Sequence, residues 1–243
     1  LEPALDAHLS RVRGMLDAGK TRDAATALFD FRVTDLSMGS AHFLVAAIDR
    51  IEAKFSAFLA ANPLPEVLQE LDALRAAAAG RLGVDASESG IDDAMLLRRQ
   101  IARRCIYGID INEIAVELAR LGVWIHTFIP GLPLSFLNHG LMWGNSLTGV
   151  GTLDEITDAL QEAEERETKS SGAGNSMLLG MALDEFMSRA GEQLDRLGGL
   201  ADSSIADVAA AAQIQSEIDA ALAPLSALCD LITAERSTRS LKR

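Results

Sequence analysis

The sequence predicts an α/β fold, in which a small parallel sheet carries long helical insertions and is followed by a helical C-terminal part. Three observations support this fold class. Two short runs of β-branched and aromatic residues, 31–34 and 105–110, are each followed by a turn and then by a helical pattern. Between these runs, apolar residues recur at spacings of three and four, which is typical of amphipathic helices. After residue 150 the sequence shows helical patterns and no strand-like run.

The composition provides for a large buried core, because 49% of the 243 residues are hydrophobic. We therefore expect one domain with a helical appendage. An N-terminal helical segment covers 1–30, and a core covers 31–150 with a helical insertion at 60–100. A helical region covers 151–243.

Strand, turn and helix follow one another in the first part of the chain. A helical pattern over 3–29 precedes the strand-like run 31–34. A turn of mostly small residues over 35–41 then leads into a helical pattern over 42–59. Strand, glycine-bearing turn and helix in this order make up one half of a Rossmann-like nucleotide-binding unit.

The predicted insertion consists of helices over 66–79 and 95–104, with a polar loop over 80–93 between them. It leads into the second strand, 105–110, which ends in an acid, Asp110. After this strand, Asn112 is placed to cap a helix that runs through Thr127. The elements predicted for the rest of the chain are a third strand at 141–143, helices at 152–168, 177–196 and 203–236, and a Gly/Ser-rich loop at 170–176.

Two residues stand where the first two strands end, and ligands bind at that edge of open parallel sheets. Gly39 allows the backbone to approach a ligand closely, and Asp110 can accept hydrogen bonds from both hydroxyls of a ribose. A dinucleotide-binding fingerprint would place such an acid roughly 20 residues after a GxGxxG run. Here that run is absent and Asp110 lies 71 residues after Gly39. The spacing disfavours a nicotinamide enzyme unless residues 60–100 are an insertion.

The motifs at the ends of these strands resemble those of S-adenosylmethionine-dependent DNA adenine-N6 methyltransferases. The run DLSMGSAHFL at 35–44 resembles the family motif DPAxGSGxFL, and RRCIYGIDIN at 103–112, continued by AVELA, resembles the second motif. GLPLSFL at 131–137 and GNSL at 144–147 are similar to the segments after the second motif in large single-chain restriction–modification enzymes of the type IIG class and in related phage-defence methylases. The resemblance covers about residues 30–150, and its specificity lies in the order of the three motifs.

The resemblance implies a class I methyltransferase core with a site for S-adenosyl-L-methionine. Asp110 would bind the ribose hydroxyls of the cofactor, and Ile111 would pack on its adenine. Asn145 stands, with Ser146 beside it, where the family often has an aspartate that contacts the exocyclic amine of the adenine. The methionine moiety would be held by the turn after the first strand, through Asp35, Ser37, Gly39, Ser40 and Ala41.

The sequence also departs from the family pattern. Ala41 replaces the second glycine of the first motif, so a positive φ at this position would weaken cofactor binding. The family's catalytic tetrapeptide, in which two prolines precede an aromatic residue that stacks on the flipped base, is missing, because the sequence has no Pro-Pro pair. The resemblance therefore implies no catalytic residue here. We expect the cofactor-binding part of a larger enzyme that methylates adenine N6 in DNA and contacts DNA through parts outside this chain.

The charge and the remaining residue types limit the possible partners. A formal net charge of −13 argues against broad contact with phosphates. The four histidines are scattered without an HxxxH or HExxH spacing, so no metal is expected. Prolines and polar residues interrupt the uncharged stretch 121–153, so no membrane span is expected. Cys105 and Cys229 form no CxxC pair, and we expect a reduced, cytoplasmic protein.

Other interpretations of the same residues remain open. Asn145 and Ser146 are equally well explained as a plain turn. Ser37 and Ser40 lack the sequence pattern of a hydrolase triad. The two rival functions are another Rossmann-like nucleotide-binding protein, such as a dehydrogenase, and a non-enzymatic helical interaction module. Titration with S-adenosylmethionine and with NAD distinguishes them.

Overall fold

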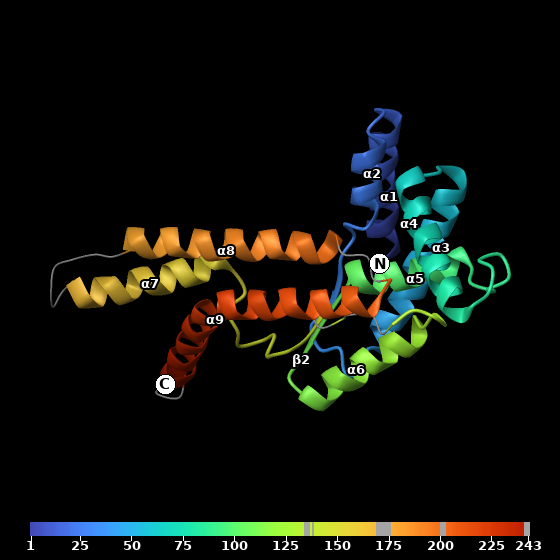
Figure 1. Ribbon diagram of the computed structural model, residues 1–243. Coiled ribbons are helices and arrows are strands. Elements are labelled where there is room, and N and C mark those ends of the chain that lie inside the picture. Colours follow the sequence, from blue (N-terminus) through green and yellow to red (C-terminus); the bar gives the residue numbers. More distant parts are fainter. Residues whose placement is uncertain (134–136, 138, 169–175, 200–202, 241–243) are drawn as a thin grey trace. The chain divides into compact units, whose positions relative to one another are not determined.

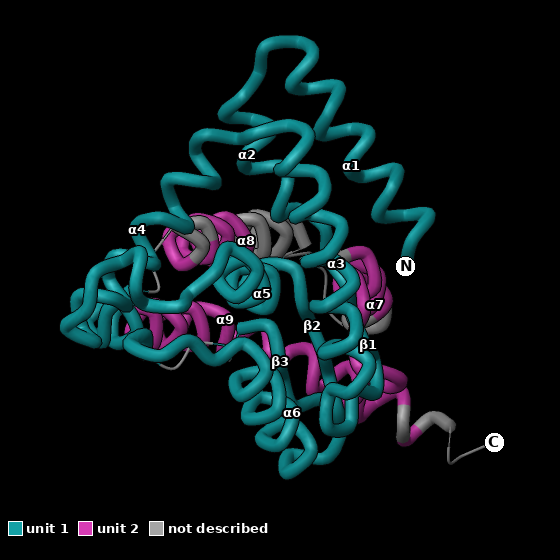
Figure 2. The backbone as a smooth tube through the Cα atoms, turned by 90° about the vertical axis from the view of Figure 1, so that its right-hand side faces the viewer, with its two compact units in different colours: residues 1–144, 201–210 teal, residues 145–200, 211–243 magenta. Residues whose placement is uncertain are grey.

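The computed structural model describes residues 1–133, 137, 139–168, 176–199 and 203–240. The chain divides into two compact units (Figure 2). The first unit comprises residues 1–144 and 201–210, and the second comprises 145–200 and 211–243. The predicted boundary after residue 150 lies six residues beyond the division after residue 144, and residues 1–30, predicted as a separate segment, are part of the first unit.

The sheet of the first unit has three parallel strands in the order β1-β2-β3. The strands are β1 (Val33–Asp35), β2 (Ile106–Asp110) and β3 (Leu141–Trp143). Val33 lies opposite Ile106, and Gly108 lies opposite Leu141. The predicted α/β class is confirmed, and the third strand has the bounds that the sequence predicts. Among the described residues, no strand follows residue 143, as predicted.

Six helices are described between residues 1 and 133. They correspond to five predicted ones, of which the first is broken in two, and the remaining bounds differ by up to three residues. The predicted helix over 3–29 is two helices, because the chain turns at Gly19, whose φ is +74°. The predicted end at residue 79 is three residues too early, since the helix continues to Leu82 and ends at the left-handed Gly83. The helices are α1 (Glu2–Asp17), α2 (Thr21–Leu28), α3 (His42–Ala61), α4 (Pro65–Leu82), α5 (Asp93–Arg104) and α6 (Glu113–His126).

Helix α3 is the centre of the packing in the first unit (Figure 1). It contacts β1, β2, α5 and α6. Its inner face is fully buried and apolar, and complete burial of one such side chain contributes about 1.5–3 kcal/mol. That face consists of Leu44, Ala47, Ile48, Ile51 and Phe55. On the outer side, Lys54 pairs with Asp6 of α1 at 2.7 Å, and Arg98 of α5 pairs with Glu52 at 3.4 Å. Such surface pairs contribute about 0–1 kcal/mol each, so the apolar face carries most of the stabilisation.

The second unit is helical in its described part. It contains α7 (Leu153–Thr168), α8 (Ser176–Gly199) and most of α9 (Ile205–Ser240). The loop predicted over 170–176 lies almost entirely outside the described residues. Ile156 of α7 and Ile232 of α9 are buried together. Pro224 lies inside α9, which Figure 1 shows bent, and a proline removes one helical hydrogen bond and bends a helix.

We predict that Gly131→Ala destabilises the protein by about 2–4 kcal/mol. Gly131 has a φ of +82°, and a Cβ atom at this position would overlap the carbonyl oxygen of Ala78. The matched control is Gly14→Ala in α1, where the added methyl group meets no atom within 4 Å. There, alanine should stabilise the helix by about 0.5–1 kcal/mol. Urea unfolding of both variants measures the two effects, and equal stabilities would contradict the prediction.

Candidate functional site

The ends of β1 and β2 lie at the same edge of the sheet, and the backbone after β1 is bonded directly to β2. Met38 N donates to the carbonyl oxygen of Ile109 at 3.1 Å. Gly39 N donates to Asp110 Oδ2 at 2.9 Å, across 71 residues of sequence. Helices α3, α4 and α5 lie between these two points of the chain. The helices between the two strands thus leave the two strand ends together.

Asp110 is held by backbone donors from both sides. Its Oδ2 accepts from Gly39 N, and its Oδ1 accepts from Asn112 N at 2.8 Å. These two bonds, with that from Asn112 the larger cause, lower the pKa of the carboxyl, although burial acts in the opposite direction. The residue is 9% exposed. Because each carboxylate oxygen has two acceptor positions, both oxygens can accept a second hydrogen bond from a ligand.

The turn after β1 is built from an Asx turn and two left-handed residues. Asp35 Oδ1 accepts from Ser37 N at 3.0 Å. Gly39 has a φ of +53° and Ala41 a φ of +65°. A left-handed conformation costs an L-residue about 1–2 kcal/mol, so Ala41 is strained where the family motif has glycine. Ala41 therefore has the positive φ that we expect to weaken cofactor binding. Its methyl group is fully buried.

The first turn of α3 is open to a negatively charged group. Its N-cap residue, Ala41, forms no side-chain capping bond, and the first turn contains no acidic residue. Free N–H groups at a helix start attract anions. Beside them, the exposed Ser40 hydroxyl and His42 Nδ1 lie 2.8 Å apart. His42 is not among the site residues predicted from the sequence. In the described part of the chain, no carboxylate is bonded to its ring, so a hydrolase triad is not formed.

An exposed apolar pair lies next to Asp110. Ile111 is 67% exposed and Trp143 is 65% exposed. Trp143 Nε1 donates to the carbonyl oxygen of Ile111 at 2.9 Å, which fixes the indole beside it. Trp143 is also the register partner of Asp110. Ile111 is among the predicted contact residues, and Trp143 is not. The sequence feature that could have indicated Trp143 is its position as an aromatic residue at the end of the third predicted strand.

Asn145 and Ser146 belong to the second unit, unlike the other predicted site residues. The side-chain oxygen of Asn145 accepts from Leu147 N at 3.0 Å and from Thr148 N at 3.2 Å. These bonds close a local turn and occupy the acceptor that the resemblance assigns to adenine. The structure therefore favours the plain-turn interpretation of Asn145.

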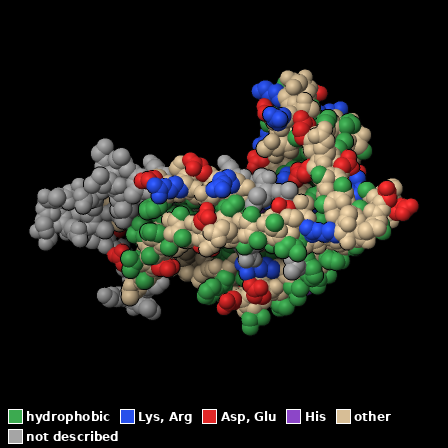
Figure 3. All heavy atoms as spheres, viewed as in Figure 1, with side chains coloured by type: hydrophobic (Ala, Val, Ile, Leu, Met, Phe, Trp, Pro, Cys, Tyr) green, Lys and Arg blue, Asp and Glu red, His purple; other side chains and the backbone are tan. Residues whose placement is uncertain are grey.

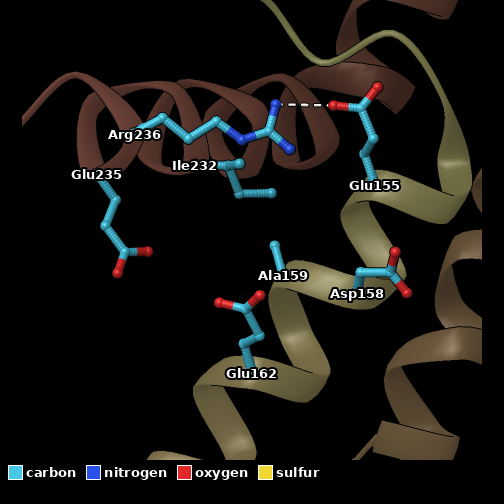
Figure 4. Close-up of a pocket in the computed structure, with 7 residues that line it drawn as sticks. All are labelled: Glu155, Asp158, Ala159, Glu162, Ile232, Glu235 and Arg236. Carbon is cyan, nitrogen blue, oxygen red and sulfur yellow. Dashed lines mark hydrogen bonds and ion pairs between the residues drawn. The ribbon is translucent and has the colours of Figure 1, made fainter. Parts of the chain in front are cut away.

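A hollow of about 230 Å³ lies between α7 and α9 in the second unit (Figure 4). Four carboxylates line it, with Ala159, Ile232 and a single cation, Arg236. Arg236 Nη1 donates to Glu155 Oε2 at 2.7 Å, and this bond is the largest cause that lowers the pKa of Glu155. The other acidic residues of the lining are Asp158, Glu162 and Glu235. A lining with this charge disfavours anionic ligands such as nucleotides.

Comparisons of the chain with protein-family models, curated proteins and solved structures found no match. Within the described ranges, no group of three or more His, Cys, Asp or Glu side chains is arranged to hold a metal ion. In the same ranges, every helix is too short or too polar to cross a bilayer.

We predict that the Asp110 carboxyl titrates below its usual pKa of 3.8. Because the unfolded chain then binds more protons, Asp110 stabilises the folded state above this usual value. The stabilisation is lost as the pH falls through the lowered pKa. Carboxyl NMR titration measures the midpoint, and Asp110→Asn assigns the signal and should weaken the acid dependence of unfolding. A midpoint at or above 3.8 would contradict the prediction.

Proposed function

We propose that the first unit binds S-adenosyl-L-methionine at the common edge of β1 and β2, as the cofactor-binding part of a DNA adenine-N6 methyltransferase. The observation that carries this proposal is the bond between Gly39 N and Asp110 Oδ2. It brings together the two motifs that the resemblance assigns to one cofactor. The order β1-β2-β3 with parallel pairing supports it, because one half of a doubly wound, Rossmann-like sheet has this order.

Asp110 suits the ribose of the proposed cofactor. An aspartate carboxyl with the usual pKa of 3.8 is ionised at neutral pH, and the bonds from Asn112 N and Gly39 N lower the pKa of Asp110 further. Hydroxyl groups that donate to a carboxylate form stronger hydrogen bonds than those that donate to neutral acceptors. Because Gly39 N and Asn112 N already orient the two oxygens, little further ordering is needed when a ribose binds.

Residues on either side of Asp110 suit the methionine end and the adenine end of the proposed cofactor. The carboxylate of the methionine moiety suits the uncapped first turn of α3 and the nearby Ser40 hydroxyl, and its ammonium group suits the Asp35 carboxylate. The adenine suits the exposed side chains of Ile111 and Trp143, because an aromatic or aliphatic face can stack on a base. Trp143 thereby joins the predicted residues as a candidate contact. Asn145 is no longer required for this proposal.

Methyl transfer in the proposed enzyme depends mainly on positioning. A preorganised site holds the sulfonium methyl group in line with the amine of a flipped adenine. The chain's own residues bind and orient the cofactor in this scheme. The residues that grip the flipped base and the DNA are assigned to other parts of the enzyme, and no metal is required.

We predict that the protein binds S-adenosylhomocysteine and that Asp110→Asn weakens the affinity about tenfold. Replacing the ribose of the ligand by 2′-deoxyribose should weaken its affinity for the wild type by a similar factor. Both changes remove the same hydrogen bond, the one between the 2′-hydroxyl and Asp110. The two changes together should then cost little more than either alone. Calorimetry measures the affinities, and quenching of Trp143 fluorescence, tested with Trp143→Phe, reports contact with the adenine.

The matched control is Asp85→Asn. Asp85 also accepts a hydrogen bond from a backbone amide, that of Ser87, but it lies in the loop after α4. This variant should bind the ligand as the wild type does. Tighter binding of NAD than of S-adenosylhomocysteine would favour the rival nucleotide-binding function. If the losses of affinity caused by Asp110→Asn and by the deoxy ligand were additive, Asp110 would not be the acceptor of the 2′-hydroxyl.

We predict that this chain alone transfers no methyl group to adenine-rich duplex DNA, even with saturating cofactor. It contains no Pro-Pro pair, and its formal net charge of −13 repels DNA. An assay with tritiated cofactor measures incorporation against a blank without protein. Incorporation above the blank that Asp35→Ala abolishes would show that the chain is a complete methyltransferase.

A further inference from the structure

Helix α6 is apolar on two opposite faces. Its inner face packs into the core through Val116, Ala119 and Val123, all of which are buried. Its outer face carries four large apolar side chains that are 49–71% exposed, namely Ile114, Leu118, Leu121 and Ile125. Figure 3 shows hydrophobic side chains gathered along the α6 edge of the molecule. A helix that is apolar on both faces is typical of a helix that is covered on both.

The outer residues follow the spacing of a coiled-coil seam. They are separated by four, three and four residues, which is the alternation of a and d positions in a heptad. The helix ends at His126, so these four residues make up the whole of the seam. Apolar side chains that were exposed at random positions would not follow this four-three-four spacing. The outer face therefore has the geometry of a surface that pairs with another helix.

The outer face is also self-complementary, so that it can pack against the same face of a second chain. Ile, Leu, Leu and Ile read the same in both directions, and so do the spacings of four, three and four. A two-fold axis near Ala119 and Arg120 would set Ile114 against Ile125 and Leu118 against Leu121 of a second chain. Isologous interfaces require such self-complementary patches. We propose that α6 pairs with α6 of a second copy of this chain, antiparallel and around a two-fold axis.

The helix dipoles favour the antiparallel direction. In the antiparallel pair the two dipoles oppose each other, whereas in a parallel pair they would align, which is unfavourable. His126, in the last turn of α6, bonds Asp49 of α3 in its own chain, with 2.8 Å between Nε2 and Oδ1, so the proposal uses no ion pair across the axis.

The area is that of a weak contact. The four outer side chains are 49–71% exposed, and their mutual burial stays below the roughly 1,000 Å² that a stable specific interface buries. An interface of this size dissociates readily. We therefore expect a dimer that forms reversibly in the micromolar range.

Sedimentation equilibrium of the intact chain tests the proposal. At about 100 µM the wild type should be dimeric, because such a concentration populates complexes with micromolar Kd. Leu118→Glu should raise the dissociation constant on the order of 100-fold, because each dimer carries the change twice and buries two charges. The matched control, Leu231→Glu, changes an exposed leucine of α9 and should leave the dimer intact. A monomeric wild type, or equal effects of both variants, would overturn the proposal.

Disulfide trapping tests the direction of pairing. In a Cys229→Ser background, which removes the only half-buried native thiol and leaves the buried Cys105, the double variant Ile114→Cys/Ile125→Cys should form covalent dimers on oxidation. Each single variant should not, because residue 114 faces residue 125 of the other chain. Circular dichroism confirms that the variants are folded. Efficient cross-linking of Ile114→Cys alone would show parallel pairing and overturn the antiparallel arrangement.

Discussion

Parallel pairing of β1 with β2 is the interaction on which the rest of the first unit depends. Because the two strands run in the same direction, both end at one edge, and the chain between them must travel back along the sheet. Helices α3, α4 and α5 make that return. The apolar face of α3 covers the two strands, so the same pairing that creates the candidate site also determines which helix faces are buried.

Local signals in the sequence predicted most of the elements. Asn112 caps α6 as expected, with its side chain accepting from Ile114 N at 3.0 Å, because capping depends on residues two or three positions apart. The break at Gly19 was missed, since a single glycine is tolerated inside a helical pattern. Trp143 was missed for a different reason. Its place opposite Asp110 depends on the register of β3 against β2, which no local pattern encodes.

Asp110 has two tasks in the proposed site, and they support each other. As an internal acceptor it ties the turn after β1 to the start of α6 through Gly39 N and Asn112 N. As a ligand acceptor it would present oxygens whose directions these bonds already determine. Asn145 shows the opposite case, since its oxygen is used within its own turn. A polar side chain at the end of a strand can thus bind a ligand, or it can bond only to its own turn. The hydrogen bonds that it already forms show which of the two is available to it.

The bond between Gly39 and Asp110 closes a loop of 71 residues, and closing a loop of this length costs chain entropy that grows with the logarithm of its length. A ligand that touches both ends would therefore act as a non-covalent cross-link across α4 and α5. Local unfolding of these helices would become rarer in its presence, although neither helix touches it. Amide exchange deep in the insertion would then slow as the ligand binds, and affinity at the sheet edge would depend on the stability of helices that carry none of its contacts.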